Sequence, residues 1–172
     1  MLGERRTIVT PRGEFILRPE VPEDERFLFD LFAANNLGIL HQAGFPTEMV
    51  EKLIDFQFHS QTKTYREMFP DALYSIVTWD GKDVGRFIEH DERHSVYFVD
   101  FVLFPEYQAI GLGSALTRAL IAEWAARGRD ARVKVRVNNE ASLKMCRKLG
   151  FVQGEPDDMA YIELRWKRPD RK

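Results

Sequence analysis

The chain has 172 residues, a length typical of one domain, and 44% of them are hydrophobic, enough to form a folded core. Its 25 Lys and Arg residues nearly balance 27 Asp and Glu residues, so it lacks the basic surplus of a nucleic-acid-binding protein. The single cysteine excludes an intramolecular disulfide and a cysteine-rich metal site. No segment reaches the ~20 apolar residues of a membrane span. We therefore expect one cytoplasmic domain, 1–172, with a charged tail over 167–172 and neither nucleic acid nor a membrane as a partner.

The first half of the chain predicts a strand followed by two helices. Residues 14–18 alternate as a strand, with Phe15 and Leu17 on one face. Pro22 suits the start of a helix, and Asn36 and Gly38 are typical of its end.

A second helix is predicted over 47–68, and two glutamines interrupt the apolar stripe that it would turn inward. At helical spacing this stripe contains Val50, Leu53, Ile54, Gln57, Gln61, Tyr65 and Met68. Buried amides need hydrogen-bond partners. Gln57 and Gln61 either make structural hydrogen bonds or, together with Tyr65, line a substrate pocket.

Strands dominate the middle of the chain. Residues 72–79 and 84–90 are joined by the turn dipeptide Asp80-Gly81, and 95–104 is apolar on both faces, as a central strand is. Strict alternation would put Asp100 on the face of Val96, Phe98 and Val102.

Helices and strands alternate after residue 105. A helix to about residue 127, a strand at 131–137, a helix at 139–149 and strands at 151–152 and 161–166 complete the order. This order predicts an α/β (α+β) fold with a mixed central sheet of about seven strands flanked by about four helices.

The junction Gln108-Ala109-Ile110-Gly111-Leu112-Gly113, between a strand and a helix, is the segment that points to chemistry. A helix start presents unpaired backbone N–H groups and a partial positive charge, and glycines let a ligand approach the backbone closely. Such a junction suits phosphate. It matches neither a P-loop, which needs a Gly-Lys-Ser/Thr ending, nor the dinucleotide fingerprint, whose third glycine is missing. By itself it is equally consistent with a tight turn.

Two motifs resemble those of the GNAT-type N-acetyltransferases. Gln108, Gly111 and Gly113 fit the Gln/Arg-x-x-Gly-x-Gly/Ala motif of that family. About thirty residues later, Asn139-Glu140-Ala141-Ser142 leads to Gly150-Phe151 and is similar to the family's second signature, with Ser142 at the usual alanine. The order of the predicted elements also resembles the family fold.

The resemblance implies acetyl-CoA as the acyl donor, bound between the strands 95–104 and 131–137. The pantetheine arm of acetyl-CoA would pair with backbone near Val102 and Leu103. Asn139 would contact the cofactor or brace the cofactor's loop. Gln108 is implied as a further cofactor-binding residue. The pyrophosphate would rest on the backbone N–H groups of Ala109, Ile110, Gly111, Leu112, Gly113 and Ser114. The acceptor would be a primary amine of a small molecule or a protein, and it would attack the acyl carbonyl directly. No metal is implied, and homodimers are common in the family.

Three residues are candidates for proton transfer. Asp100 and Glu89 are carboxylates on predicted strands and would serve as a general base, or else pair with arginine. Cys146 stands where many family members have the tyrosine that protonates the departing CoA. It is either a proton donor or a small buried residue. The missing tyrosine leaves a second function open, a non-catalytic module that binds or senses acyl-CoA.

Overall fold

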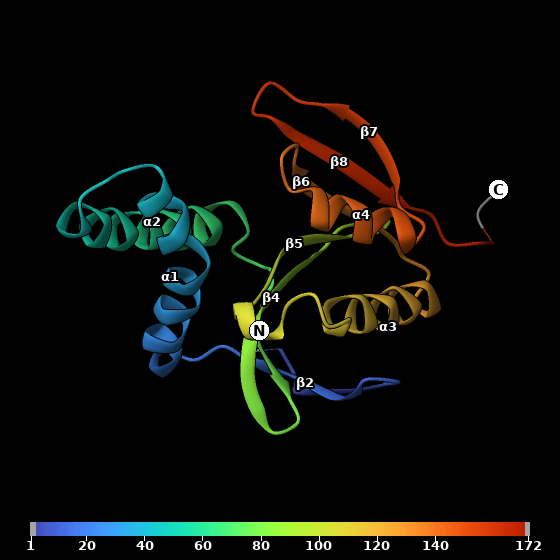
Figure 1. Ribbon diagram of the computed structural model, residues 1–172. Coiled ribbons are helices and arrows are strands. Elements are labelled where there is room, and N and C mark those ends of the chain that lie inside the picture. The colour runs from blue at the N-terminus through green and yellow to red at the C-terminus, as the bar shows by residue number, and fades with distance from the viewer. Residues whose placement is uncertain (1–2, 171–172) are drawn as a thin grey trace.

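The computed structural model describes residues 3–170, and an eight-stranded mixed sheet runs through the molecule with helices on both faces (Figure 1). The strand order is β1-β2-β3-β4-β5-β6-β8-β7. The strands are β1 (Arg6–Thr10), β2 (Gly13–Pro19), β3 (Leu73–Trp79), β4 (Lys82–Asp91), β5 (Ser95–Leu103), β6 (Asp130–Arg136), β7 (Val152–Pro156) and β8 (Tyr161–Trp166). The α-helices are α1 (Glu25–Gln42), α2 (Thr47–Met68), α3 (Leu112–Ala126) and α4 (Glu140–Lys148). The predicted fold class is confirmed.

The first strand and the end of the first helix differ from the sequence-based prediction. The edge strand β1 was not predicted, although Thr7, Ile8 and Val9 are β-branched, and it pairs antiparallel with β2. Helix α1 runs past Asn36 and Gly38, which were expected to end it. Asn36 donates its side-chain N–H to the carbonyl of Phe32 and so follows the helix instead of stopping it.

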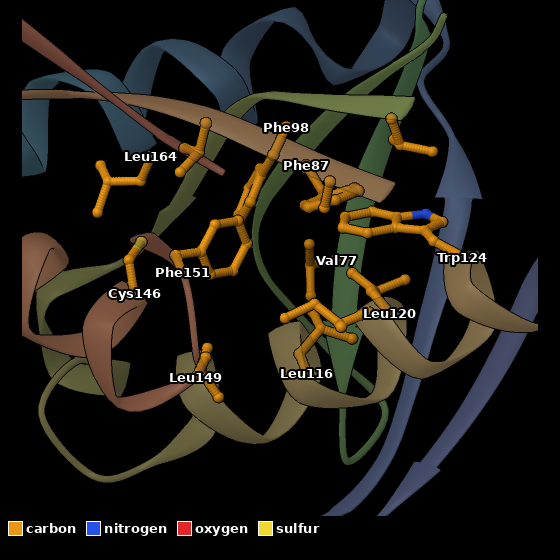
Figure 2. Packing of buried hydrophobic residues seen from close by; sticks show 14 of the residues in the cluster. Val77, Phe87, Phe98, Leu116, Leu120, Trp124, Cys146, Leu149, Phe151 and Leu164 are labelled. Carbon is orange, nitrogen blue, oxygen red and sulfur yellow. The ribbon is translucent and has the colours of Figure 1, made fainter. Parts of the chain in front are cut away.

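Each face of the sheet has its own apolar core. On one face, side chains of β3, β4 and β5 pack against α3 and α4, and the rings of Phe87, Phe98 and Trp124 lie in contact within this cluster (Figure 2). On the other face, Leu28 of α1 and Phe58 of α2 cover Ile76 of β3. Below, these are called the α3/α4 face and the α1/α2 face.

The inward stripe of α2 is different from the predicted one in its second half. Val50 and Ile54 are buried as expected, but Phe58 takes the next inward position and Gln57 is exposed. Met68 is 63% exposed. The inward stripe therefore runs through Val50, Ile54 and Phe58, with Phe58 in place of Gln57. It continues to Gln61 and Tyr65, which are both half-buried.

A β-bulge in β5 corrects the predicted face of Asp100. Asp100 pairs with Ile88, whereas Phe98 pairs with Glu89, the next residue of β4, so Val99 is an extra residue. The bulge reverses the alternation, and Asp100 lies with Val102 on the α1/α2 face, opposite Val96 and Phe98. The prediction was right for Val102 and wrong for the other two.

Among residues 3–170, no helix is both long and apolar enough to cross a membrane. Of the predicted charged tail, residues 171 and 172 lie outside the described part of the chain.

Candidate functional site

The parallel strands β5 and β6 separate halfway along their length. Residues 95–98 of β5 pair with residues 130–133 of β6. Beyond that point β5 stays with β4 as far as Leu103, and β6 stays with β8 as far as Arg136. The N–H of Phe104 donates to the carbonyl of Val84 in β4. Because strand groups alternate in direction, the backbone groups of Phe101 and Leu103 therefore face the open edge of β5.

Two amides hold the exit of β5. The carbonyl of Leu103 accepts hydrogen bonds from Asn35 Nδ2 at 3.1 Å and from Gln108 Nε2 at 2.7 Å. Gln108 also donates to Asn35 Oδ1 at 2.7 Å. The side chain of Gln108 therefore braces the strand exit, and Asn35 of α1 is a partner that no sequence motif indicated.

The junction after β5 turns sharply to start α3. Ala109 has φ 59° and Gly111 has φ 86°, both in the left-handed region. Gly111 is the N-cap, so Leu112, Gly113 and Ser114 form the first turn of α3. Their N–H groups have no acceptor within the helix. A Cβ on Gly113 would lie 3.7 Å from its nearest neighbours, Met145 and Phe101. The junction thus presents backbone donors at the positive end of a fifteen-residue helix.

Asn139 caps the other helix that approaches the separated strands. Its Oδ1 accepts the N–H of Ser142 at 3.2 Å, one of the first N–H groups of α4. This hydrogen bond braces the start of α4, and the contact of Asn139 with the cofactor stays a prediction.

Three predicted site residues meet at an arginine that the sequence analysis did not single out. Arg86 Nη2 donates to Asp100 Oδ2 at 2.5 Å and to Gln61 Oε1 at 3.0 Å. Its guanidinium carbon lies 5.7 Å from the centre of the Tyr65 ring. Burial, with the negative charge of Asp100 second, raises the pKa of Tyr65, so the phenol stays protonated. Gln57 does not join this cluster, because it lies on the exposed side of α2.

A cavity of about 300 Å³ lies on the α1/α2 face beside this cluster. Arg86 and Tyr65 line it, and so do side chains from the start of α1 and from β3. The other lining residues are Glu20, Val21, Pro22, Glu25, Leu28, Phe58, His59, Thr62, Arg66 and Tyr74. Among the described residues, no group of three or more His, Cys, Asp or Glu side chains is arranged to hold a metal ion.

Comparisons with known proteins agree with this geometry. A sequence model of the family described as FR47-like protein matches residues 89–157, which include the separated strands and the junction. The structure of the PaiA N-acetyltransferase from Thermoplasma acidophilum, solved with coenzyme A, superposes with a TM-score of 0.63 at 17% identity, over 89% of this chain and 98% of that one. The RimL ribosomal L7/L12 alpha-N-protein acetyltransferase with coenzyme A gives 0.64 at 18%, over 97% and 100%. The chain has the GNAT fold.

A third structure extends the comparison. The ribosomal-protein-S18-alanine N-acetyltransferase from Escherichia coli is 25% identical, with a TM-score of 0.52 over 62% of this chain and 76% of that one. A search of curated protein sequences gives no match. The resemblance to the GNAT-type N-acetyltransferases is confirmed by the fold and by the family model together.

Within the GNAT fold, the two candidate carboxylates lie on opposite faces of the sheet. Glu89 is 3% exposed and accepts a hydrogen bond from Arg6 Nη2 at 2.8 Å, and Arg6 also bonds Glu123 of α3. Glu89 therefore belongs to an ion-pair network on the α3/α4 face. Asp100 lies on the α1/α2 face, and its side chain is 23% exposed.

Cys146 lies in the apolar core of the GNAT fold. It is 2% exposed and packs in the cluster with Leu149 and Phe151 (Figure 2). Burial raises the pKa of its thiol to about 11, although Arg147 counteracts this in part. The thiol is therefore fully protonated near neutral pH, and its surroundings are those of a packing residue.

Proposed function

We propose that the chain is an acyl-CoA-dependent N-acetyltransferase that transfers an acetyl group from acetyl-CoA to a primary amine. The observation that carries this proposal is the open edge of β5 ending at the junction that starts α3, within a GNAT fold. The structures of PaiA and RimL with coenzyme A support a CoA site in this fold. A cytoplasmic location and a homodimer stay predictions.

In this proposal backbone groups supply most of the donor site. The N–H groups of residues 109–114 receive the pyrophosphate, because they combine free donors with a helix dipole. The pantetheine arm, whose amides resemble an added strand, pairs with the open edge of β5 at Phe101 and Leu103. The backbone groups of Val102, which was also expected to contact the arm, point toward β4. The outward N–H at Leu103 or Phe101 is suited to stabilise the oxyanion of the tetrahedral intermediate.

Asp100 is the better candidate for the base. An aliphatic amine has a pKa of ~10.4, so a proton must leave it before attack. Asp100 is on the same strand as the proposed pantetheine contacts, close to the open edge, and is partly exposed. Glu89 is buried against α3 in its pair with Arg6.

Asp100→Asn is therefore expected to lower kcat by about 10²-fold or more. The loss of kcat in Glu89→Gln should be at least ten times smaller than in Asp100→Asn, and the main effect should be lower stability. Equal losses of kcat in the two variants would contradict the choice of Asp100 as the base.

Cys146 is not needed as the proton donor in this mechanism. Its thiol is enclosed by apolar side chains, and holding the amine and thioester together accounts for much of the acceleration. Cys146→Ala is expected to keep at least about a tenth of the wild-type kcat, since a positioned acid contributes ~10²–10⁴-fold. A loss of 10²-fold with unchanged KM and an unchanged fold would assign the thiol a catalytic role.

The proposal is tested by a screen of amines with acetyl-CoA, in which released CoA thiol is measured. Sustained release of thiol that depends on one class of amine, with a matching N-acetylated product by mass spectrometry, is the expected result. Gly113→Val, in which a branched side chain stands at the proposed pyrophosphate contact, is the matched negative control.

A non-catalytic module that binds or senses acyl-CoA is the second candidate. It is favoured by one observation, namely that both candidate carboxylates are in ion pairs and the thiol is buried. This function predicts binding of acetyl-CoA with no amine-dependent release of thiol across the whole screen.

A further inference from the structure

We propose that the acceptor is a small amine that also carries a carboxylate, and that Arg86 binds this carboxylate from the cavity on the α1/α2 face. This inference rests on the proposed function and names the substrate class of the same site. It begins with the environment of Arg86. Its residue exposure is 7%, so more than nine-tenths of it is buried, yet it lines a cavity of about 300 Å³.

The guanidinium of Arg86 has N–H donors that make no hydrogen bond to a side chain. Both of its side-chain hydrogen bonds, to Asp100 and Gln61, use Nη2. Nε and Nη1 have no side-chain hydrogen-bond partner among residues 3–170. Nε is shielded from solvent, so Nη1 is the unused donor that a ligand in the cavity can reach. A guanidinium offers five N–H donors in a planar fork, and the groups that fill such a fork best are the two oxygens of a carboxylate.

Arg86 is also a permanent charge. Burial by itself would lower the pKa of the guanidinium, but the carboxylate of Asp100 outweighs this and the pKa stands above its ordinary value. A cation that is both charged and buried needs neighbouring anionic or acceptor atoms, and a bound carboxylate adds a second set of them.

The other ionic groups of the cavity already have partners. Glu20 accepts from Arg66 at 2.7 Å, and Arg66 lies over the ring of Tyr74. Glu25 lies 3.8 Å from His59. Arg86 is therefore the cation of the lining that combines deep burial with unused donors.

The Arg86–Asp100 pair matches a molecule with an amine and a carboxylate a few atoms apart. Asp100 does not line the cavity itself, but its Oδ2 accepts the hydrogen bond from Arg86, which does. Its side chain is 23% exposed, so its other oxygen can accept from an ammonium group beside the cavity. An α-amino acid carries its ammonium group and its carboxylate on the same carbon atom, so one molecule can reach both Asp100 and Arg86. Aromatic side chains of Phe58, Tyr65 and Tyr74 line the rest of the cavity and suit an apolar or aromatic side chain on the substrate.

The test compares amino acids with their carboxamides, which keep the amine and remove the negative charge. Phenylalanine, methionine and histidine and their amides would be assayed as acceptors with acetyl-CoA. The wild type should prefer at least one acid over its amide by about tenfold or more in kcat/KM. In Arg86→Gln this preference should fall to about threefold or less.

Controls separate recognition from folding. Arg6→Gln removes a part-buried, ion-paired arginine on the opposite face, and it should leave the acid-to-amide ratio as in the wild type. If Arg86→Gln does not fold, the neutral pair Arg86→Gln with Asp100→Asn takes its place, because it leaves no carboxylate without its partner cation. The acid-to-amide ratio should fall in this double variant as it should in Arg86→Gln.

Binding is measured separately from turnover. Isothermal titration of the wild type with the N-acetylated acids and their amides, in the presence of CoA, should show binding of the acid alone, and weaker binding in Arg86→Gln. Equal use or binding of acids and amides by the wild type overturns the inference, and so does a preference that survives in Arg86→Gln, or no binding of any acid. Titration with acetyl-CoA alone reports on the proposed function, so the two failures are distinguishable.

Discussion

Gly85 allows the close approach of strands β4 and β5. A Cβ on Gly85 would lie 2.2 Å from the carbonyl oxygen of Val102 and 2.8 Å from Leu103 Cδ2. Because the first of these atoms is backbone, the strands themselves would have to move. We expect Gly85→Ala to lower the free energy of unfolding by about 3 kcal/mol, measured by denaturant titration.

Gly38→Ala is the matched control for this substitution. Gly38 lies within α1, and a Cβ added there would have no neighbour within 4 Å. Alanine costs less backbone entropy in a helix, so stability should rise by about 0.5–1 kcal/mol. A neutral Gly85→Ala would show that β4 and β5 are not held as tightly as described.

The burial of Cys146 predicts a pH effect with a definite sign. The thiol's pKa is about 11 in the folded protein and near 9 when exposed, so the unfolded state loses the proton first as pH rises. The stabilising effect of the protonated thiol is present below pH 9 and lost between pH 9 and 11, about 2 kcal/mol in all. Cys146→Ala removes it. The stability difference between wild type and variant should shrink over this pH range; a constant difference would contradict the buried thiol.

Residues also show where the sequence could and could not predict the site. The glycines of the junction were found because the backbone conformation there requires them, Gly111 at φ 86°. Arg86 was missed because a charged residue inside a strand is ordinarily read as solvent-facing, and only the packing of α2 against the sheet buries it. Gln57 was placed inward because a uniform helical period cannot anticipate that the larger Phe58 takes the core position.

At the scale of elements, the sequence predicted the order and the type of nearly all helices and strands. It missed the bulge at Val99, since an extra β-branched residue in an apolar strand leaves no mark in the pattern. The bulge matters for the proposed function, because it turns Asp100 toward Arg86 and away from the α3/α4 core. It also precedes the point at which the open edge of β5 presents Phe101 and Leu103.

The start of α3 carries a prediction of its own. Alanine at Gly113 would make only ordinary contacts at 3.7 Å, and it has the better helix propensity, so the fold should be as stable as the wild type. If phosphate lies against this turn, the added Cβ should raise the Kd for acetyl-CoA about tenfold or more. The Kd would be measured by titration calorimetry. An unchanged Kd in a folded Gly113→Ala protein would place the pyrophosphate elsewhere.

At the scale of the whole molecule, the GNAT fold brings together segments far apart in the sequence: α2, β4 and β5 around Arg86, and the junction beside the separated strands (Figure 1). The proposed donor side of the site could be recognised in the sequence, because it consists of consecutive residues with a recognisable pattern. The acceptor side depends on contacts between elements, and these arise only in the folded chain.

The most direct test of this account is calorimetric melting of the wild-type protein with and without acetyl-CoA. A ligand at a hundred times its Kd stabilises the folded state by ~2.7 kcal/mol. For a chain of this size that is a rise in Tm of about 5–10 °C. We predict this rise, and we predict that it falls to about half or less in Gly113→Val at the same concentration. An unchanged Tm of the wild type at millimolar acetyl-CoA would contradict both the acetyltransferase and the acyl-CoA-binding function.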